Sequence, residues 1–253
     1  MIGLETTIRN IQDASTVDAA FEVFKTYLVD LGYDNAVYTL LTDHPSIGQQ
    51  ALHGVATDYP EDWIRYYIEQ DYQQIDPVCI YSLKRPVPFF WKDAVESLRR
   101  DPHIDPSLLA RSSLVMDQGA EAGVADGIGM SFINRYGEVA GFGISRERVE
   151  PTHDYTVLST IYLAASMFHD KFLSLHSNVA TPSLTEREKD ILAWAAEGKS
   201  DWEIATILGI KHPTVRYHWS NIFKKLDATN RLLATAIAIQ KKIVTPQSIR
   251  LQK

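Results

Sequence analysis

The sequence predicts an α+β protein in two parts: an N-terminal α-β-α sandwich around a mainly antiparallel sheet, and a C-terminal all-α domain with a helix-turn-helix. Helical and strand-like segments alternate through the first part, whereas the second has only helical spacing around a Gly-containing turn. The net charge also changes sign between them. Because 253 residues suffice for two ordinary domains, we expect a domain at 1–176, a linker at 177–183 and a second domain at 184–253.

The N-terminal part is expected to alternate helices and strands, with Gly and Pro residues at several boundaries. Gly32 ends the first helix and Pro60 opens another. Pro86 and Pro88 keep the chain that follows them extended. The expected elements are a helix at 17–31, strands at 35–42 and 49–55, a helix at 61–71, a short helical piece from Asp76-Pro77, a helix at 106–122, strands at 127–135 and 138–145, and a long helix at 153–176.

The C-terminal part is expected to form four short helices. The first two are each preceded by Thr or Ser with Glu three residues later, which is the spacing of a capping box, and each is followed by Gly. A proline that suits a first helical turn opens the third helix, at 212–226, and a fourth is expected at 231–243. The boundary residues are Thr185 with Glu188, Gly198, Ser200 with Glu203, Gly209 and Pro213. Helix, Gly-containing turn and helix is the pattern of a helix-turn-helix, whose second helix enters the DNA major groove.

The third helix has an apolar stripe and a polar remainder. Its expected buried side is Val215, Trp219, Ile222, Phe223 and Leu226. The other faces carry side chains able to contact bases or phosphates: His212, Thr214, Arg216, Tyr217, Ser220, Asn221, Lys224 and Lys225. Arg216 best suits a bidentate contact with guanine, whereas the lysines suit phosphates. The alternative is an ordinary amphipathic helix with a solvated polar face.

The distribution of charge along the chain supports two domains with different functions. From Leu184 onward there are 12 Lys plus Arg against 7 Asp plus Glu, a net charge of +5. Residues 1–183 hold 13 basic and 25 acidic residues, a net charge of −12. A basic C-terminal domain can neutralise DNA phosphates while the acidic domain stays clear of the duplex.

Several classes of protein are disfavoured. No apolar run approaches the ~20 residues of a membrane span, the N-terminus lacks the pattern of a signal peptide, and a lone cysteine, Cys79, suits a reducing cytoplasm. The eight histidines form no HxH or HxxH pair, and no GxSxG motif occurs. The first strand ends without the acidic pair that a phosphorelay receiver needs. We therefore expect a cytoplasmic protein with no catalytic residues, no metal and no cofactor.

Aromatic residues cluster around one acid in the N-terminal part. Tyr59, Trp63 and Tyr67 are four residues apart and would share a helical face if the helix begins by Tyr59, with Asp76 and Trp91 following. Aromatic rings with a few polar tips are the usual lining of a small-molecule pocket. Two other interpretations stay open: the aromatic residues form an ordinary core, and Asp76 before Pro77 caps a helix.

The C-terminal part resembles the DNA-binding domain of the LuxR family of bacterial regulators. The resemblance covers the whole domain and rests on Leu184, Thr185, Arg187, Glu188, Leu192, Ala195, Gly198, Glu203, Ile204, Ala205, Leu208, Ile210, Thr214, Val215, His218, Asn221, Ile222, Lys225, Leu226, Arg231 and Ala234. It leaves the upstream domain open, because both phosphorelay receivers and ligand sensors carry this DNA-binding domain.

The aromatic cluster resembles the acyl-homoserine-lactone-binding domain of the same family. The likeness implies that Trp63 donates to the lactone carbonyl, that Tyr59 bonds the amide carbonyl and that Asp76 accepts from the amide N–H, while Tyr67 and Trp91 wall the pocket. A buried amide needs such partners for both its donor and its acceptor. Candidates for lining the acyl tail, which core packing also explains, are Tyr38, Leu40, Leu41, Leu52, Ile75, Val78 and Met130.

The segment at 123–131 also resembles the Gly-rich stretch of this family, with two departures from the family pattern nearby. Ser131 stands where many members have proline, and Gly143 falls where some place a hydroxyl that contacts a 3-oxo group, although Ser145 is close in sequence. These departures leave the substituent on the acyl chain open.

The resemblance implies a quorum-sensing transcriptional regulator that binds an N-acyl-homoserine lactone and acts as a homodimer on palindromic operators. Its partners would be double-stranded DNA, the lactone and, as a further partner to test, RNA polymerase. The apolar residues at 153–176 and 231–243 are expected to contribute dimer contacts; for the long helix, packing entirely within its own domain is the alternative. A LuxR-type regulator that responds to another signal, without a cognate synthase, is the alternative function.

Overall fold

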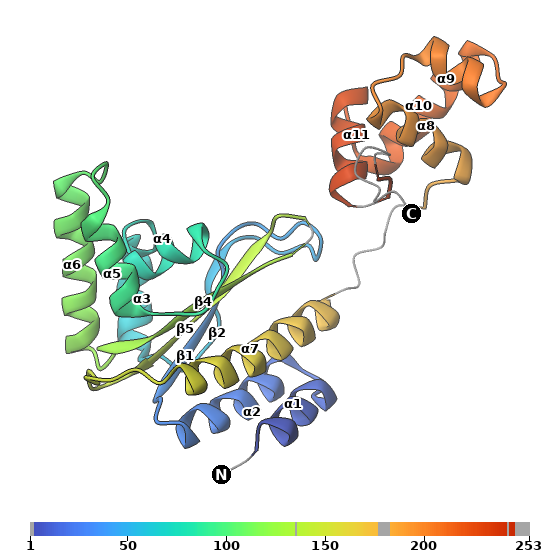
Figure 1. The fold of residues 1–253 in the computed structure, drawn as a ribbon. Coiled ribbons are helices and arrows are strands. Elements are labelled where there is room, and N and C mark those ends of the chain that lie inside the picture. The colour runs from blue at the N-terminus through green and yellow to red at the C-terminus, as the bar shows by residue number, and fades with distance from the viewer. Residues whose placement is uncertain (1–2, 135, 177–182, 242, 246–253) are drawn as a thin grey trace. The chain divides into compact units, whose positions relative to one another are not determined.

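The computed structural model describes residues 3–134, 136–176, 183–241 and 243–245, which belong to two compact units, Met1–Val179 and Ala180–Lys253 (Figure 1). The predicted α+β class, with a mixed N-terminal domain and an all-helical C-terminal one, is confirmed. Residues 177–182 of the expected linker and the end of the chain from 246 lie outside the described residues. The boundaries 1–176, 177–183 and 184–253 therefore stay predictions.

The N-terminal unit is built on an antiparallel five-stranded sheet with strand order β2-β1-β5-β4-β3. The second strand begins three residues later than expected, because a turn closed by a bridge between His44 and Gln49 precedes it. Arg135, the expected end of the fourth strand, lies outside the described residues. The strands are β1 Asn35–Leu40, β2 Leu52–Thr57, β3 Phe89–Phe90, β4 Asp126–Ile133 and β5 Val139–Arg146.

Helices cover both faces of this sheet, which makes the predicted sandwich (Figure 1). On one face lie α1 Leu4–Asp13, α2 Val17–Asp30 and α7 Tyr155–His176. On the other lie α3 Glu61–Glu69, the 3₁₀ turn η1 Tyr72–Gln74, α4 Pro77–Lys84, α5 Trp91–Arg100 and α6 Pro106–Glu121.

Two of these helices, α1 and α5, were not predicted from the sequence. In α1 Thr7 and Ile11 are buried and Leu4 and Ile8 are half-buried, which is the spacing of one helical face. In α5 the buried residues Trp91, Ala94 and Leu98 have helical spacing, but the remaining residues of WKDAVESLRR are mostly charged. Both segments therefore carry helical spacing opposite a polar or charged face, a signal in the sequence that the prediction missed.

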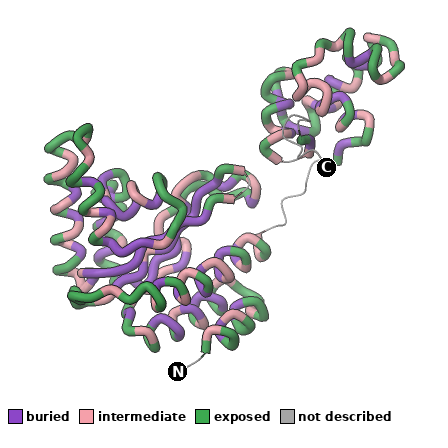
Figure 2. Tube along the Cα trace, viewed as in Figure 1, coloured by how far each residue is buried: buried purple, intermediate pink, exposed green. Residues whose placement is uncertain are grey.

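Side chains along the strands point alternately to the two faces of the sheet, and each face has its own hydrophobic cluster. Tyr38 of β1 and Phe142 of β5 turn to the helices α2 and α7, where they pack against Phe24, Phe168 and Phe172 in the larger core. The opposite face of the sheet, toward α3–α6, carries a second cluster that contains the aromatic residues singled out above. The sheet is therefore buried on both faces, as Figure 2 shows.

The C-terminal unit consists of α8 Glu186–Ala196, α9 Asp201–Leu208, α10 His212–Leu226 and α11 Arg231–Gln240 around its own core. Both predicted capping boxes are present, since Thr185 and Ser200 each exchange hydrogen bonds with the Glu three residues on. Gly209 adopts a left-handed conformation (φ +64°) that ends α9 and makes the turn before α10. The last helix ends at Gln240, three residues before the predicted end.

Candidate functional site

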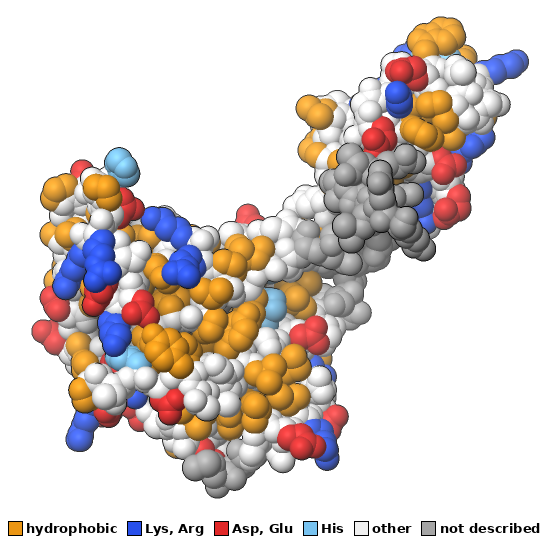
Figure 3. All heavy atoms as spheres, viewed as in Figure 1, with side chains coloured by type: hydrophobic (Ala, Val, Ile, Leu, Met, Phe, Trp, Pro, Cys, Tyr) orange, Lys and Arg blue, Asp and Glu red, His pale blue; other side chains and the backbone are white. Residues whose placement is uncertain are grey.

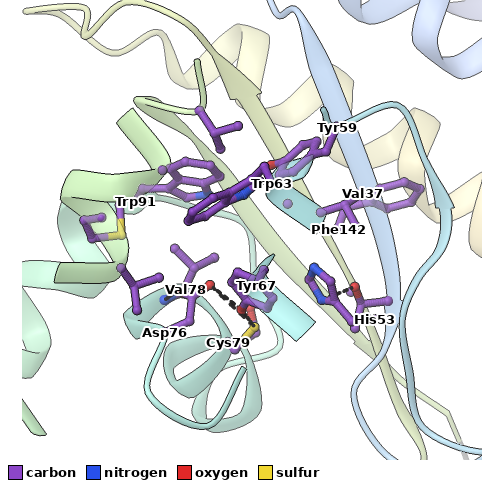
Figure 4. A pocket seen from close by; sticks show the side chains of 18 of the residues that line it. Val37, His53, Tyr59, Trp63, Tyr67, Asp76, Val78, Cys79, Trp91 and Phe142 are labelled. Carbon is purple, nitrogen blue, oxygen red and sulfur yellow. Dashed lines mark hydrogen bonds between the residues drawn. The ribbon is translucent and has the colours of Figure 1, made fainter. Parts of the chain in front are cut away.

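The five residues predicted to bind a ligand, Tyr59, Trp63, Tyr67, Asp76 and Trp91, all line one cavity between the sheet and helices α3–α6 (Figure 4). All four aromatic side chains are at most 8% exposed. The cavity measures about 60 Å³, which is room for a few water molecules. The aromatic cluster is therefore both a packed layer and the wall of a void, so the two interpretations of its sequence pattern are compatible.

Helix α3 places two of these residues by simple spacing. Trp63 and Tyr67 are one turn apart and meet edge to face, with ring centroids 5.9 Å apart. Tyr59 does not share their helix as the spacing suggested, because α3 begins at Glu61. It reaches the same cavity from the turn before the helix.

Asp76 has both of the roles considered for it. Its Oδ1 accepts from the backbone N–H of Val78 (2.7 Å), which caps α4, and its Oδ2 accepts from the hydroxyl of Tyr67 (2.7 Å). Burial raises the pKa of the Asp76 carboxyl, although the bonds from Tyr67 and Val78 oppose the shift. Burial and the nearby Asp76 raise the pKa of Tyr67 in turn. The carboxyl group is thus a buried acceptor at the cavity wall.

Three polar atoms around the cavity are buried without a hydrogen-bond partner among the described residues: Tyr59 Oη, Trp91 Nε1 and Ser145 Oγ. Tyr59 and Ser145 are near each other, and burial raises the pKa of Tyr59 despite that neighbour. Buried polar groups are normally paired, and an unpaired one costs free energy. A ligand with carbonyl oxygens would satisfy such donors. The indole N–H of Trp91 is an addition to the expected set, because the sequence suggested only a wall for this residue.

Glycines occupy the middle of the cavity-facing side of β4 and β5. Gly127, Gly129, Gly141 and Gly143 occupy alternate positions there. A Cβ added at Gly127 would lie 2.8 Å from the Trp91 ring, and one at Gly129 would lie 2.3 Å from the Phe89 ring. The Gly-rich stretch noted in the sequence therefore makes room for the aromatic side chains.

The two departures from the family pattern have local explanations. Ser131 donates to the backbone oxygen of Ser82 (2.7 Å), which ties β4 to α4. A Cβ at Gly143 would lie 3.3 Å from the Tyr59 hydroxyl and 3.1 Å from Val37, so a larger residue there would press on the cavity wall.

Three of the suggested tail-lining residues lie elsewhere. Tyr38, Leu40 and Met130 face the opposite side of the sheet, in the core with α2 and α7, because they occupy the other set of alternate strand positions. The hydroxyl of Tyr38 is paired with His169 (2.7 Å). Leu41 and Val78 do line the cavity, Leu52 lines a neighbouring pocket, and Ile75 packs within the aromatic cluster.

His53 of β2 is a cavity residue that sequence reasoning missed. Its ring stacks on Tyr67, with centroids 4.4 Å apart and planes 18° apart, and its Nδ1 bonds Thr39 Oγ1 (3.1 Å). Its place depends on the register between β1 and β2, and no local pattern in the sequence encodes that register. Only the strand alternation could have indicated which face it takes.

In the C-terminal unit, α10 presents the predicted polar face. Val215, Trp219, Ile222 and Leu226 are buried and Phe223 is half-buried. The predicted DNA contacts that are exposed are Thr214, Arg216, Tyr217, Ser220, Lys224 and Lys225, while His212 and Asn221 are half-buried. Hydrophobic, basic and acidic side chains are interspersed on the visible face of this unit (Figure 3).

Two of the predicted DNA contacts have partners within the unit. Lys225 donates to the buried carboxylate of Glu188 (2.7 Å), so it joins α10 to α8. Burial alone would raise the pKa of Glu188, but the bonds from Lys225 and Thr185 outweigh it and hold the pKa below its usual value. His212 stacks on the exposed ring of Trp202, with centroids 4.6 Å apart.

A polar cluster fixes the orientation of α10. Asp201 accepts from the indole N–H of Trp219 (3.0 Å) and from Arg231 (2.8 Å), which also donates to the backbone oxygen of Lys199. The guanidinium lies over the Trp219 ring, 5.4 Å from its centroid. The cluster joins the start of α9 to α10 and α11.

The described parts of the chain contain no group of three or more His, Cys, Asp or Glu side chains placed to hold a metal ion. Among the helices whose residues are described, none is both long and apolar enough to cross a membrane.

Comparison with known proteins identifies both units. The family model for an autoinducer binding domain matches residues 16–172, and the model for bacterial regulatory proteins of the luxR family matches residues 182–238. The quorum sensing-dependent transcriptional regulator RpaR of Rhodopseudomonas palustris is 32% identical over 187 residues, which cover 73% of this chain and 72% of RpaR.

Solved structures show the same fold. SdiA of Escherichia coli covers 96% of this chain and 98% of its own, with a TM-score of 0.74 and 23% identity. SdiA in complex with octanoyl-rac-glycerol covers 94% of this chain and 93% of its own, with a TM-score of 0.70 and 23% identity. With an autoinducer-binding domain followed by a helix-turn-helix domain, the chain belongs to the LuxR family of quorum-sensing transcriptional regulators.

Proposed function

We propose that this regulator binds an N-acyl-homoserine lactone in the cavity beneath α3–α6 and, as a cytoplasmic homodimer, binds palindromic operators through α10. One observation supports the ligand above all: a buried carboxylate acceptor, Asp76, shares the cavity with the hydroxyl of Tyr59, which is unpaired among the described residues, and with the indole of Trp63. A secondary amide and a lactone carbonyl together need one such acceptor and two donors. The indole N–H of Trp91, also unpaired among the described residues, is a further donor at the same wall.

In this proposal the amide N–H donates to Asp76 and its carbonyl accepts from Tyr59, while the lactone carbonyl accepts from Trp63. Burying an amide without such partners would cost free energy, so the polar set selects for that group. Tyr67 positions the carboxylate of Asp76 through its hydroxyl. The role is recognition, and we assign no catalytic step to the chain.

The experiment is a thermal-shift titration of the full chain with N-octanoyl homoserine lactone, comparing the wild type with Asp76→Asn. Ligand at about 100 times its Kd should stabilise the wild type by about 2.7 kcal/mol, whereas the variant should need a far higher concentration. Asp62→Asn, at a carboxylate that is 90% exposed on α3, is the matched control. An identical titration by Asp76→Asn and the wild type would overturn the assignment of the carboxylate.

A different small molecule is the second candidate. The solved complex of SdiA, a protein with this fold, contains an acylated glycerol, and an ester with free hydroxyls would also satisfy an acceptor and several donors. The two candidates separate by competition, because each should displace the other if they share the cavity. Binding of the glyceride but of no lactone would favour the second candidate.

DNA recognition is proposed to rest on the exposed face of α10. Arg216→Ala should remove discrimination at one base pair of each half-site, by about 1–3 kcal/mol. Measured relative affinities for operators substituted at single positions would show this loss. An unchanged preference at every position would mean that Arg216 does not contact a base.

The dimer is proposed to form through α11, where Leu232 and Leu233 are 81% and 40% exposed and Ala236 is exposed on the same side. The long helix α7 offers less, because Ile161, Ala164, Phe168 and Phe172 are buried within its own domain. Binding of ligand to the folded sensor would shift the population toward the DNA-binding dimer, with RNA polymerase a partner to test.

A further inference from the structure

A second pocket opens on the outside of the N-terminal unit and shares a wall with the ligand cavity. His53 and Tyr67 line both of them. The outer pocket measures about 200 Å³, against about 60 Å³ for the inner cavity. Its other lining residues are Ala51, Leu52, Ile68, Asp71 and Gln73. A stacked pair of rings, 4.4 Å between centroids, is thus all that the two pockets have in common.

The rim of the outer pocket is apolar where it meets this pair. Leu52 of β2 is 55% exposed and Ile68 of α3 is 51% exposed, and each is next in sequence to one of the two rings. Exposed aliphatic side chains on either side of a hollow favour an apolar occupant, since covering them removes apolar surface from water. The acidic and amide side chains of Asp71 and Gln73 lie on the remaining rim.

The two rings of the shared wall are held unequally. Tyr67 is 4% exposed, donates to Asp76 (2.7 Å) and contacts Cys79 Sγ (3.4 Å). His53 is half-buried and has one hydrogen bond, to Thr39. Burial lowers the pKa of His53 to about 4, so the ring is neutral at neutral pH and an apolar chain beside it would bury no charge. Of the two side chains, His53 is the more exposed and has fewer hydrogen bonds to break if it turns aside.

The ends of the cavity differ in chemistry. Trp91 and His53 lie on opposite sides of it, with Trp63 and Tyr67 between them (Figure 4). The unpaired indole N–H is at the Trp91 end, and the outer pocket adjoins the His53 end. A ligand with a polar head and an apolar tail would therefore point its tail toward His53.

We propose that the outer pocket receives the distal part of the ligand's acyl chain, which passes between His53 and Tyr67 and lies against Leu52 and Ile68. The proposal rests on the proposed function, since it extends that ligand beyond the inner cavity. It makes this regulator selective for long chains, because the terminal methylenes gain a surface that short chains never reach.

The test is a chain-length series with the full-length protein. Dissociation constants for butanoyl, octanoyl and dodecanoyl homoserine lactones are measured for the wild type, for the double variant Leu52→Gln with Ile68→Gln, and for Leu83→Gln. Leu83 is 49% exposed on α4 and lines neither pocket, so it controls for the loss of an exposed leucine. The quantity compared is the ratio of dodecanoyl to butanoyl affinity.

Each methylene buried from water strengthens binding by about fourfold. The wild type and Leu83→Gln should therefore prefer the dodecanoyl lactone strongly. The double variant should lose at least about tenfold of that preference, because the amide groups of the two glutamines would replace the aliphatic contact with the acyl chain poorly. An equal ratio in all three proteins, or no gain from octanoyl to dodecanoyl in the wild type, would overturn the proposal.

A parallel series of monoacylglycerols separates this proposal from the lactone assignment. If glycerides bind with the same dependence on chain length and on the double variant while lactones do not bind, the tail path holds and the lactone head group is wrong. If lactones bind but the double variant keeps the full ratio, the tail path is wrong and the lactone stands. Binding of neither series would overturn both.

Discussion

At the scale of single residues, Asp76 shows why one side chain supports two interpretations of its sequence pattern. Its two oxygens have separate partners, the backbone of α4 and the hydroxyl of Tyr67, so capping does not compete with a role in the cavity. The sequence could place Trp63 and Tyr67 because helical spacing is local. It could not place His53, whose neighbours come from a strand register that depends on the whole sheet.

The buried carboxyl of Asp76 should make stability depend on pH. Its pKa is raised in the folded state, so the group favours folding when protonated, and this contribution is lost as the pH rises through the folded pKa. Asp76→Asn should therefore gain melting temperature relative to the wild type as the pH rises from about 4 toward neutrality. Melting curves of both proteins across that range test the sign, and Asp62→Asn controls for net charge. A difference that shrinks with rising pH would contradict it.

At the scale of elements, two adjacent lysines of α10 have different surroundings. Lys225 neutralises the carboxylate of Glu188, whose side chain is only 3% exposed. Lys224 is exposed on the face proposed to bind DNA. Both lysines were predicted to contact phosphates, because the spacing of residues within α10 does not indicate that Glu188 of another helix lies beside Lys225.

Lys225→Met should destabilise the C-terminal unit by about 1–3 kcal/mol, since it removes the only cation paired with the buried carboxylate of Glu188 among the described residues and leaves it the bond from Thr185. Lys224→Met, the matched control, should change stability by less than about 0.5 kcal/mol. Urea unfolding followed through the tryptophan fluorescence of this unit would measure both. Equal stability of the two variants would mean that the pair with Glu188 contributes nothing.

Strand β4 depends on the absence of side chains on one face. Gly129→Ala would bring a methyl group to 2.3 Å from the Phe89 ring, and such overpacking typically costs about 1–3 kcal/mol. Gly3→Ala, where a Cβ meets nothing within 4 Å, is the control. Thermal unfolding should separate the two, and a Gly129→Ala protein as stable as Gly3→Ala would show that Phe89 moves freely.

The two helices that escaped prediction, α1 and α5, are each ten residues long. The helices α2, α6, α7 and α10 have wide or repeated apolar faces and were expected close to their observed positions. In α5 the buried residues Trp91, Ala94 and Leu98 have helical spacing, and Asp93 accepts from the backbone N–H of Phe90 at its start, so local helix signals are present. They were missed because Pro86 and Pro88 led to the expectation of an extended chain.

At the scale of the whole molecule, the separation of charge supports the two-domain division that the helix-turn-helix pattern predicted. The net charge of +5 from Leu184 onward and of −12 before it indicates that DNA phosphates attract one unit and repel the other. The two hydrophobic cores of the N-terminal unit and the single core of the C-terminal one share no residues.

The salt dependence of operator binding should report only phosphate contacts of the basic unit. Removing one such contact with Lys224→Met should reduce the slope of log K against log salt by about 0.9, while relative preferences among operators stay the same. Fluorescence anisotropy at several salt concentrations gives the slope. A slope equal to that of the wild type would place Lys224 away from the phosphates.

The glycine face of β4 and β5 has a consequence for how the pocket can adapt. Glycines have no side chains to rotate, so this wall can change shape only through the backbone of the sheet, and added methyl groups there meet the Trp91 and Phe89 rings. Change of specificity must then come from the helical wall and from β2. A series of chemical probes for this protein should accordingly keep one planar group where the probe faces the sheet. Its substituents should vary where the probe faces α3 and His53.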